Sequence, residues 1–303
     1  MAAHDRIRLT GQLREGPRSR GPSYCSGVPV TVEPQVALAW IERVAGGRRE
    51  RTRDELAVEE PLEIRVDGEP IAVAMRTPGD DEELAVGFLA GEGLLGSRQE
   101  IAGVGPTEDF AANVVEVRTR NGLRRDPSGE RRFSLTSSCG VCGKAALEFV
   151  RQEAPPAGGA GAPVEPELVL ELPEATRRRQ SGYARTGGLH ASALFAPGEG
   201  GRLLALREDV GRHNALDKAI GALLLEGRFP LPGVLGCLSG RAGFELVQKA
   251  SLAGMLGLVA VGAPTTLAVE LARERGMLLC GFVKANSFNV YAGVGHLSAP
   301  EQG

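Results

Sequence analysis

The sequence lacks the features that would send a chain into or through a membrane. It has no run of eighteen apolar residues and no apolar stretch at its N-terminus, so neither a membrane-spanning helix nor a signal peptide is expected. The chain also lacks an excess of positive charge, because its 35 Lys and Arg are outnumbered by 38 Asp and Glu, which gives a formal net charge of −3. Nucleic-acid-binding proteins usually carry a basic footprint. We therefore expect a cytoplasmic protein with no membrane and no nucleic-acid partner.

Cysteine is scarce as well, and its distribution narrows the chemistry. Of five cysteines in 303 residues, Cys25, Cys237 and Cys280 stand alone, whereas Cys139 and Cys142 form a C-x-x-C pair. An odd number of mostly isolated cysteines is typical of a reducing compartment. A structural zinc site needs four ligands, and the sequence has neither a second C-x-x-C nor an H-x-x-x-H. Zinc is therefore the weaker explanation of the pair.

The C-x-x-C pair lies in a stretch that favours ionised cysteine. Residues 137–144 read Ser-Ser-Cys-Gly-Val-Cys-Gly-Lys, and the apolar spacing after them predicts a helix that starts near Cys142. A helix N-terminus and Lys144 both stabilise negative charge, and the thiolate is the reactive form of cysteine. Three chemistries remain open from these residues: a cysteine that carries sulfur or attacks a substrate, a thioredoxin-like redox pair, and half of a zinc site.

Composition and periodicity divide the chain into three parts. Residues 1–31 lack apolar periodicity, which indicates a disordered tail. Residues 32–137 are predicted to form a β-rich domain, and residues 138–303 a second domain with the C-x-x-C loop at its start and a flexible linker around 154–166. In the second domain, strands alternate with amphipathic helices, which predicts a parallel or mixed sheet flanked by helices. The fold class is therefore α/β, or α+β overall.

Local patterns place the elements within these parts. Asp67-Gly68 predicts a hairpin turn, and Asp80 or Asp81 is expected to begin a helix that ends at Gly96. Further strands of the first domain are expected at 36–44, 56–59 and 114–119. Strands of the second domain are expected at 189–195, 202–207, 234–238, 258–261 and 277–283, with helices from Asn214, after Gly243 and from Thr265 or Thr266 to Gly276.

Three polar loops follow strands of the predicted second sheet, at 208–213, 239–243 and 262–266. Ligands of such sheets bind where strands end and loops lead into helix N-termini. Arg212, His213 and Arg241 lie in these loops, and we expect them to bind an anionic ligand of nucleotide type. His190, at a strand start, is the other histidine that either serves the site or has a structural role.

Together these motifs resemble the formate dehydrogenase accessory sulfurtransferases, the FdhD family. The resemblance runs from about residue 55 to 292 and rests on several long motifs in the family's order. They are Met75-Arg76-Thr77-Pro78, Gly87-Phe88 with Glu92-Gly93, Ser137 to Gly143, Glu208 to Lys218, Ser239-Gly240-Arg241, Ala263-Pro264-Thr265 and Phe288-Asn289-Val290-Tyr291.

The resemblance implies a specific function. Proteins of this family take persulfide sulfur from a cysteine desulfurase and pass it to the molybdenum or tungsten bis-molybdopterin guanine dinucleotide cofactor, which formate dehydrogenase then uses. Cys139 is by that carry-over the expected persulfide carrier, and Cys142 a second carrier or resolving thiol. Family resemblance also implies a homodimer and a second domain similar to cytidine deaminases, with three layers.

The resemblance also implies a cofactor-binding segment near the C-terminus, which falls on Phe282, Val283, Lys284, Ala285, Asn286 and Ser287. Lys284 stands where Arg is expected, so the charge is kept but bidentate phosphate binding is lost. No metal ligands of the chain's own are expected.

Two competing functions follow from the same motifs. Deamination needs H-x-E or C-x-E ahead of P-C-x-x-C, but Ala191 and Ser192 follow His190, and no proline precedes Cys139. The missing residues disfavour a deaminase. The remaining alternative is a non-enzymatic chaperone that inserts the cofactor and in which the C-x-x-C is structural.

Overall fold

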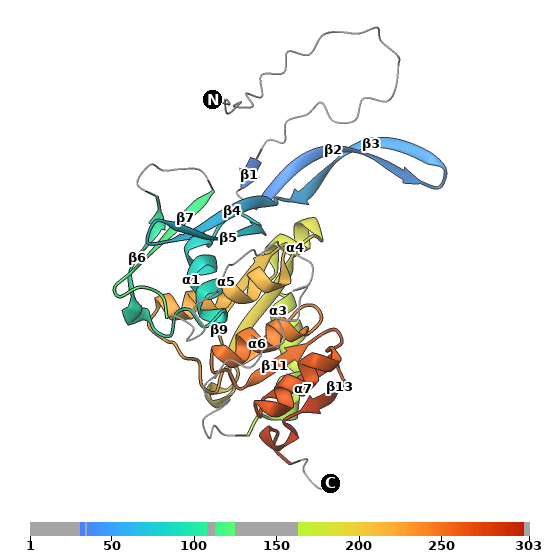
Figure 1. The fold of residues 1–303 in the computed structure, drawn as a ribbon. Coiled ribbons are helices and arrows are strands. Elements are labelled where there is room, and N and C mark those ends of the chain that lie inside the picture. The colour runs from blue at the N-terminus through green and yellow to red at the C-terminus, as the bar shows by residue number, and fades with distance from the viewer. Residues whose placement is uncertain (1–30, 34, 108–112, 125–162, 300–303) are drawn as a thin grey trace, which may run out of the picture.

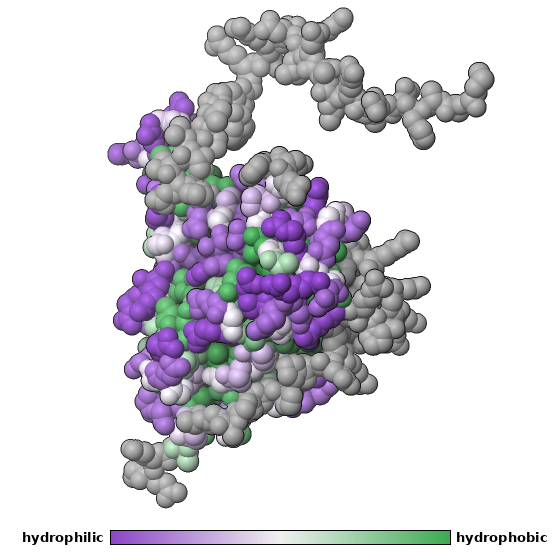
Figure 2. Space-filling model, turned by 90° about the vertical axis from the view of Figure 1, so that its left-hand side faces the viewer, coloured by the Kyte–Doolittle hydropathy of each residue, from purple (hydrophilic) through white to green (hydrophobic). Residues whose placement is uncertain are grey.

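The computed structural model describes residues 31–33, 35–107, 113–124 and 163–299. Within these ranges the strands form three sheets (Figure 1). The structure is a mixed α/β fold with strands in both halves of the chain. Among the described residues, no helix is both long and apolar enough to cross a membrane. On the face seen in Figure 2, hydrophilic residues surround smaller hydrophobic areas.

The first half of the chain supplies two of the sheets. The three-stranded sheet has the order β1-β2-β3, and the four-stranded sheet has the order β5-β4-β7-β6. The predicted turn is confirmed: Asp67 and Gly68 both have positive φ and connect β4 to β5. The strands are β1 (Thr31–Glu33), β2 (Val36–Ala45), β3 (Arg48–Ala57), β4 (Glu60–Val66), β5 (Glu69–Arg76), β6 (Ile101–Pro106) and β7 (Val114–Thr119).

The second half forms a six-stranded sheet with the order β13-β12-β11-β10-β8-β9. β10, β11 and β12 are parallel, whereas β8, β9 and β13 pair antiparallel with their neighbours. These directions confirm the predicted mixed sheet, and along the chain its strands alternate with helices as expected. The strands are β8 (His190–Ala196), β9 (Arg202–Asp209), β10 (Leu235–Leu238), β11 (Gly257–Ala260), β12 (Leu278–Lys284) and β13 (Ser287–Ala292).

Helices cover both faces of this sheet. One face packs against α5, α6 and α7, and the opposite face packs against α3, because alternate residues of the buried strands belong to two separate apolar clusters. The helices are α1 (Asp81–Gly91), α3 (Pro166–Arg177), α4 (Ser181–Thr186), α5 (Arg212–Leu225), α6 (Phe244–Leu252) and α7 (Thr266–Glu274).

The two halves share one core. Helix α1, from the first half, crosses α5 so closely that a Cβ on Gly87 would overlap the carbonyl oxygen of Asp217, and a Cβ on Gly221 would overlap that of Glu83. Only glycine permits this approach. One apolar cluster runs from Leu62 of β4 through both helices to the six-stranded sheet. The predicted boundary at 137/138 lies outside the described residues.

Several predicted elements differ from the structure. Strand β3 begins at Arg48, not at 56, and with β2 forms a hairpin closed by Gly46 and Gly47, both with positive φ. Helix α1 ends at Gly91, five residues before the predicted Gly96, and α5 starts at Arg212, two residues before Asn214.

The predicted linker around 154–166 is wrong at its C-terminal end. Val164 is buried and forms a bridge to Leu297, and helix α3 begins at Pro166. Helix α3 was not predicted, because Pro173 lies inside it and proline usually ends a helix. The earlier part of the linker lies outside the described residues.

Candidate functional site

The loops singled out in the sequence meet at one edge of the six-stranded sheet, which we term the carboxyl edge. Because β10, β11 and β12 are parallel, the loops that follow them leave the same side of the sheet. Strand β8 runs the other way, so its first residue, His190, also lies there, paired with Asp209 at the end of β9. The topology thus gathers segments from four different loops.

Backbone hydrogen bonds join these loops side by side. The N–H of Gly262 donates to the carbonyl of Gly240 at 3.0 Å, and the N–H of Phe282 donates to the carbonyl of Gly262 at 3.1 Å. Arg241 is exposed, between these contacts and the bridge from Ala242 to Pro264. The structure therefore brings Arg241 and the start of the 282–287 segment to the same edge.

His190, Arg212 and His213 form a basic cluster at this edge. The pKa of His190 is lowered, first by burial and then by the nearby charges of Arg212 and His213, while Asp209 acts in the opposite direction. A Cβ on Gly240 would lie 3.4 Å from Nδ1 of His190, so the loop after β10 lies directly beside this ring. A neutral imidazole next to a guanidinium can bind an anion and exchange a proton.

His213 is held by a carboxylate from the next helix. Its Nε2 lies 2.9 Å from Oε2 of Glu245 in the first turn of α6. The hydrogen bond from His213 is the main cause of the lowered pKa of Glu245. Two elements far apart in sequence therefore fix the orientation of this imidazole.

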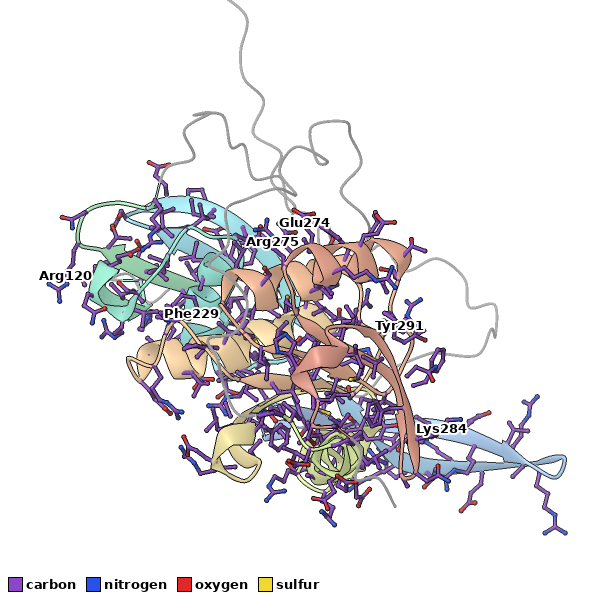
Figure 3. The ribbon with its side chains drawn as sticks, turned by 90° about the horizontal axis from the view of Figure 1, so that it is seen from below. Arg120, Phe229, Glu274, Arg275, Lys284 and Tyr291 are labelled. Carbon is purple, nitrogen blue, oxygen red and sulfur yellow. The ribbon has the colours of Figure 1, made fainter. Side chains whose placement is uncertain are left out.

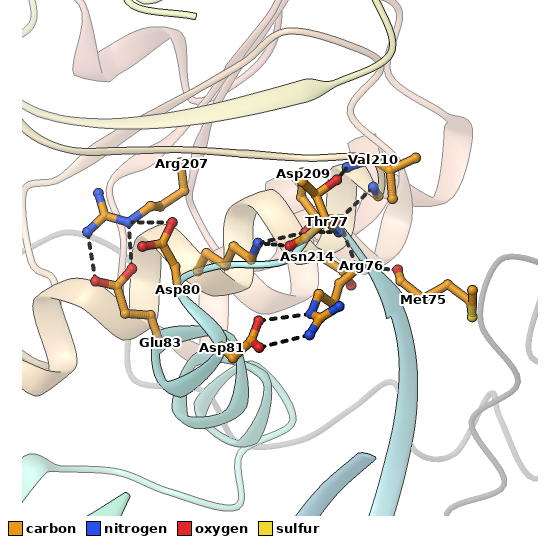
Figure 4. Close-up of polar contacts among 12 residues, drawn as sticks. Met75, Arg76, Thr77, Asp80, Asp81, Glu83, Arg207, Asp209, Val210 and Asn214 are labelled. Atoms are coloured by element: carbon orange, nitrogen blue, oxygen red, sulfur yellow. Dashed lines mark hydrogen bonds and ion pairs between the residues drawn. The ribbon is translucent and has the colours of Figure 1, made fainter. Parts of the chain in front are cut away.

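Asp209 anchors the turn that leads to Arg212 and His213, and Figure 4 shows its contacts with Thr77 and Asn214. Its carboxylate is fully buried and pairs with Nζ of the equally buried Lys218 at 2.8 Å. Oδ1 accepts hydrogen bonds from the N–H of Gly211 at 2.8 Å and from Nδ2 of Asn214 at 3.0 Å. These bonds anchor the start of helix α5, so the Asp209–Lys218 pair positions the site without reaching its surface.

The segment after β5 completes this anchor. The N–H of Thr77 donates to Oδ2 of Asp209 at 3.1 Å, and Lys218 donates to the carbonyl of Thr77 at 2.8 Å. The Thr77 hydroxyl accepts from the N–H of Val210 at 3.1 Å.

Next to Thr77, the buried side chain of Arg76 binds the carboxylate of Asp81 through two nitrogens, each at 2.9 Å. Residues Met75 to Pro78 are one of the motifs that carry the family resemblance. The structure gives them a physical role, because they join the two halves of the chain.

Sequence reasoning missed a second buried ionic group behind the basic cluster. Nζ of Lys249 lies 3.1 Å from Oε1 of Glu92 and 3.1 Å from Oδ1 of Asp217, and over the ring of Phe88 at 5.1 Å. Burial opposes the charge of Lys249, but Asp217 and Glu92 outweigh it and raise its pKa. Burial raises the pKa of Asp217 to about 6, while Lys249 acts in the opposite direction.

The contact between Asp217 and Lys249 is an ion pair without good hydrogen-bond alignment. Oδ1 of Asp217 is buried and has no hydrogen bond of acceptable geometry, although Nζ of Lys249 is close enough for an ion pair. A misaligned donor stabilises a carboxylate less than an aligned one, so Lys249 offsets the burial of Asp217 only in part. Glu92 follows the end of α1, whereas Asp217 lies in α5 and Lys249 in α6, so no local pattern could have revealed the group.

The predicted cofactor-binding segment 282–287 ends β12 and leads through a turn into β13. Phe282 has a φ of 51° and is 46% exposed, while Lys284, Ala285, Asn286 and Ser287 are all exposed. Val283 points into the core and is 2% exposed, so its side chain is unavailable to a ligand. Lys284 is the last residue of β12 (Figure 3).

The predicted sulfur carriers, Cys139 and Cys142, lie outside the described residues, as does Cys25. Cys237 and Cys280 are buried in strands, and burial raises the pKa of each thiol to about 12. Such thiols stay protonated and unreactive at neutral pH. Within the described ranges, no group of three or more His, Cys, Asp or Glu side chains is arranged to hold a metal ion.

Comparisons with known proteins match the part of the chain that contains these motifs. The model of the FdhD/NarQ family matches residues 57–298. A protein of Streptomyces avermitilis named "Sulfur carrier protein FdhD" is 50% identical over 260 residues, which cover 83% of this chain and 92% of that protein. A Mycobacterium tuberculosis protein of the same name is 48% identical over 252 residues, covering 79% of this chain and 91% of the relative.

A solved structure shares the fold. A putative formate dehydrogenase accessory protein from Desulfotalea psychrophila superimposes with a TM-score of 0.68 and covers 88% of this chain and 100% of its own. The two sequences are 20% identical, so this likeness supports the fold alone. The arrangement of sheets and helices is thus found in an experimentally determined structure.

Proposed function

The chain belongs to the FdhD/NarQ family, and from that membership we propose that it is a sulfur carrier required for formate dehydrogenase activity. The observation that carries the proposal is its 50% identity to a sulfur carrier protein over nearly the whole length of that relative. The finer mechanism is that of a sulfurtransferase. It takes sulfur from a cysteine desulfurase in the cytoplasm and passes it to the bis-molybdopterin guanine dinucleotide of molybdenum or tungsten.

The first step loads the carrier cysteine. The thiolate of Cys139 attacks the terminal sulfur of the desulfurase persulfide, which leaves a persulfide on Cys139 and a free thiolate on the desulfurase. Lys144 and the glycines around the pair favour an accessible thiolate. Cys237 and Cys280 cannot take this role, because they are buried and their thiols are not ionised.

The second step delivers sulfur at the carboxyl edge. The dinucleotide cofactor is the substrate there, and its phosphates are anions that Arg212, Arg241 and Lys284 can bind. Backbone N–H groups at the start of α5 and the imidazole of His190 add further donors next to Arg212. The anchoring of this turn by Asp209 and Lys218 keeps the basic cluster in place when the ligand is absent.

The third step releases the sulfur. The thiolate of Cys142 attacks the inner sulfur of the Cys139 persulfide, expels hydrosulfide toward the metal and leaves a Cys139–Cys142 disulfide. A cellular thiol must then reduce the disulfide before the next cycle. Sulfide is a soft ligand, which suits transfer to molybdenum or tungsten.

The experiment that tests the proposal is intact-protein mass spectrometry after incubation with a cysteine desulfurase and cysteine. Wild type should gain the mass of added sulfur, and a reductant should remove it. Cys139→Ala should not gain it, whereas the matched control Cys25→Ala should behave as wild type. Equal loading of the Cys139→Ala and wild-type proteins would contradict the assignment of the carrier.

The same experiment separates the alternative function. A cofactor-insertion chaperone with a structural C-x-x-C predicts no sulfur gain in any variant and one zinc ion per chain in the native protein. The sulfurtransferase predicts the reverse, because a zinc-bound thiolate would not be free to attack a persulfide.

A further inference from the structure

Four ionisable side chains face one another between helices α5 and α6, in two layers. His213 and Asp217 lie four residues apart on α5, and Glu245 and Lys249 lie four residues apart on α6, so each helix presents both of its members on one face. The outer layer joins Nε2 of His213 to Oε2 of Glu245 at 2.9 Å. The inner layer joins Oδ1 of Asp217 to Nζ of Lys249 at 3.1 Å. The inner layer therefore lies about 5 Å below the carboxyl edge, one turn of helix.

The inner layer holds two carboxylates for one cation. Nζ of Lys249 lies 3.1 Å from Glu92 as well as 3.1 Å from Asp217, so the group has one uncompensated negative charge when both acids are ionised. Among the described residues, Oδ1 of Asp217 has no aligned hydrogen-bond donor. A Cβ on Gly91 would lie 3.1 Å from both Oδ1 and Nζ, so the end of α1 closes over the pair. A buried carboxylate in this position favours uptake of a proton.

The two layers act on each other. Burial raises the pKa of Asp217 to about 6, with Glu92 adding to this rise and Lys249 and His213 opposing it. The pKa of Glu245 is lowered mainly by its hydrogen bond from His213 and further by the charge of Lys249. The other charged residues near α5 pair with one another or lie beside its first turn. They are Glu83, Arg207, Asp209, Lys218, His190 and Arg212. A change of charge at the carboxyl edge thus acts on the protonation of Asp217.

We propose that Asp217 sets the affinity of the carboxyl edge for anions, because anion binding there is coupled to proton uptake by this buried carboxylate. When Asp217 is ionised, the uncompensated negative charge of the inner layer opposes the phosphates of a ligand. When Asp217 is protonated, the inner layer is neutral. By linkage, a bound anion disfavours the ionised carboxylate, so Asp217 takes a proton from solvent as the ligand binds. The proposal rests on the proposed function in taking a guanine dinucleotide as the ligand of this edge.

Asp217 is in this view a positioning residue, because it lies below the surface of the site and acts on the ligand through its charge. A merely structural role predicts the opposite effect of its replacement. If the carboxylate only held α5 and α6 together, Asp217→Asn would loosen the His213 side of the site and weaken binding at every pH. The coupling predicts that the neutral amide binds an anion more tightly than wild type at neutral pH, where wild-type Asp217 is ionised in the free protein.

The experiment measures guanosine diphosphate binding by calorimetry from pH 5 to pH 8. The ratio of the wild-type dissociation constant to that of Asp217→Asn should be about 1 at pH 5 and should rise to at least about threefold at pH 8. The ratio cancels the titration of the nucleotide phosphates and of His190 and His213, which both proteins share. The matched control Glu226→Gln removes the same charge at the exposed far end of α5 and should keep a constant ratio.

Carbon-13 NMR of the aspartate carboxyl groups tests the coupling in the wild-type protein, without a variant that has to fold. One aspartate carboxyl should titrate near pH 6 in the free protein, and its midpoint should move to higher pH when guanosine diphosphate is saturating. The same resonance should be absent from Asp217→Asn, whose folding is checked by circular dichroism.

Three results would overturn the proposal: a ratio that stays constant from pH 5 to pH 8, a carboxyl midpoint that guanosine diphosphate does not move, or a wild-type protein that does not bind the nucleotide. Sulfur loading of Cys139, measured separately on wild type, decides the proposed function. Failure to load would contradict the carrier role and leave the coupling intact, whereas normal loading with a constant ratio would contradict the coupling alone.

Discussion

Two buried Lys–Asp pairs, each with one member on helix α5, differ in how completely their carboxylates are satisfied. Asp209, paired with Lys218, accepts three further hydrogen bonds, from Thr77, Gly211 and Asn214. Asp217, paired with Lys249, has a buried oxygen without an aligned hydrogen bond, and burial raises its pKa to about 6. A fully satisfied pair acts as a fixed joint, whereas a partly satisfied pair can change its protonation state.

The largest effect should come from breaking the satisfied pair. Lys218→Met leaves the Asp209 carboxylate buried beside backbone donors but without a cation, which should lower the free energy of unfolding by about 3–5 kcal/mol. Urea unfolding followed by circular dichroism measures the loss. The matched control is Lys284→Met, an exposed lysine whose replacement should change stability little. A loss below about 1 kcal/mol for Lys218→Met would contradict the role of this joint.

The second prediction uses the pH dependence of the other pair. The pKa of Asp217 is raised from 3.8 to about 6, so the folded state binds more protons than the unfolded state between these values. Its contribution to stability is therefore fully present below about pH 4 and is lost as pH rises through 6, at most about 3 kcal/mol.

Asp217→Asn should remove this pH dependence. The difference in unfolding free energy between wild type and the variant should shrink as the pH rises from 4 to 7. The exposed control Glu274→Gln should show no such trend. If the difference in unfolding free energy grew with pH instead, Lys249 would keep Asp217 ionised and the pKa of Asp217 would not be raised.

Breaking the partly satisfied pair should cost less than breaking the satisfied one. In Lys249→Met, Asp217 can take up a proton at neutral pH, so the loss should be about 1–3 kcal/mol, the cost of a buried polar group left without a partner. The measurement is the same urea titration, run beside Lys218→Met. Equal losses in the two variants would remove the proposed distinction between the pairs.

The smallest effect is expected at the surface of the site. Glu245→Ala removes the side-chain oxygen that holds His213, but the Glu245 side chain is 44% exposed, so stability should fall by less than about 1 kcal/mol. The effect should instead appear in guanosine diphosphate binding, measured by calorimetry, because the His213 imidazole is no longer held in place. Unchanged binding in this variant would show that His213 does not serve the ligand.

The sequence predicted the elements whose signals are local. Thr265 caps α7 by accepting from the N–H of Ala268, as expected from its type and position. The meeting of the glycine-bearing loops at one edge followed from the alternation of strands and helices. Strand β2 was predicted, but β3 was predicted only at its C-terminal end, because most of its residues are charged and lack the apolar alternation of a half-buried strand.

The rest of the site depends on contacts that have no local signal. Thr77 meets Asp209 across 132 positions of sequence, and Glu92 meets Lys249 across 157. A buried lysine looks in sequence like any solvated lysine on a helix, and only the fold shows which of them lack water. The prediction for Cys139 and Cys142 lies outside the described residues and stays a prediction.

The measurement that tests the central claim most directly follows labelled sulfur from the carrier to its substrate. Protein loaded by a cysteine desulfurase and radiolabelled cysteine is mixed with the guanine dinucleotide cofactor, and the label on the cofactor is counted. Wild type should load and transfer, Cys139→Ala should do neither, and Arg212→Ala should load normally but transfer poorly. Transfer of label by Cys139→Ala, or full transfer by Arg212→Ala, would contradict the division between a carrier cysteine and a cofactor-binding carboxyl edge.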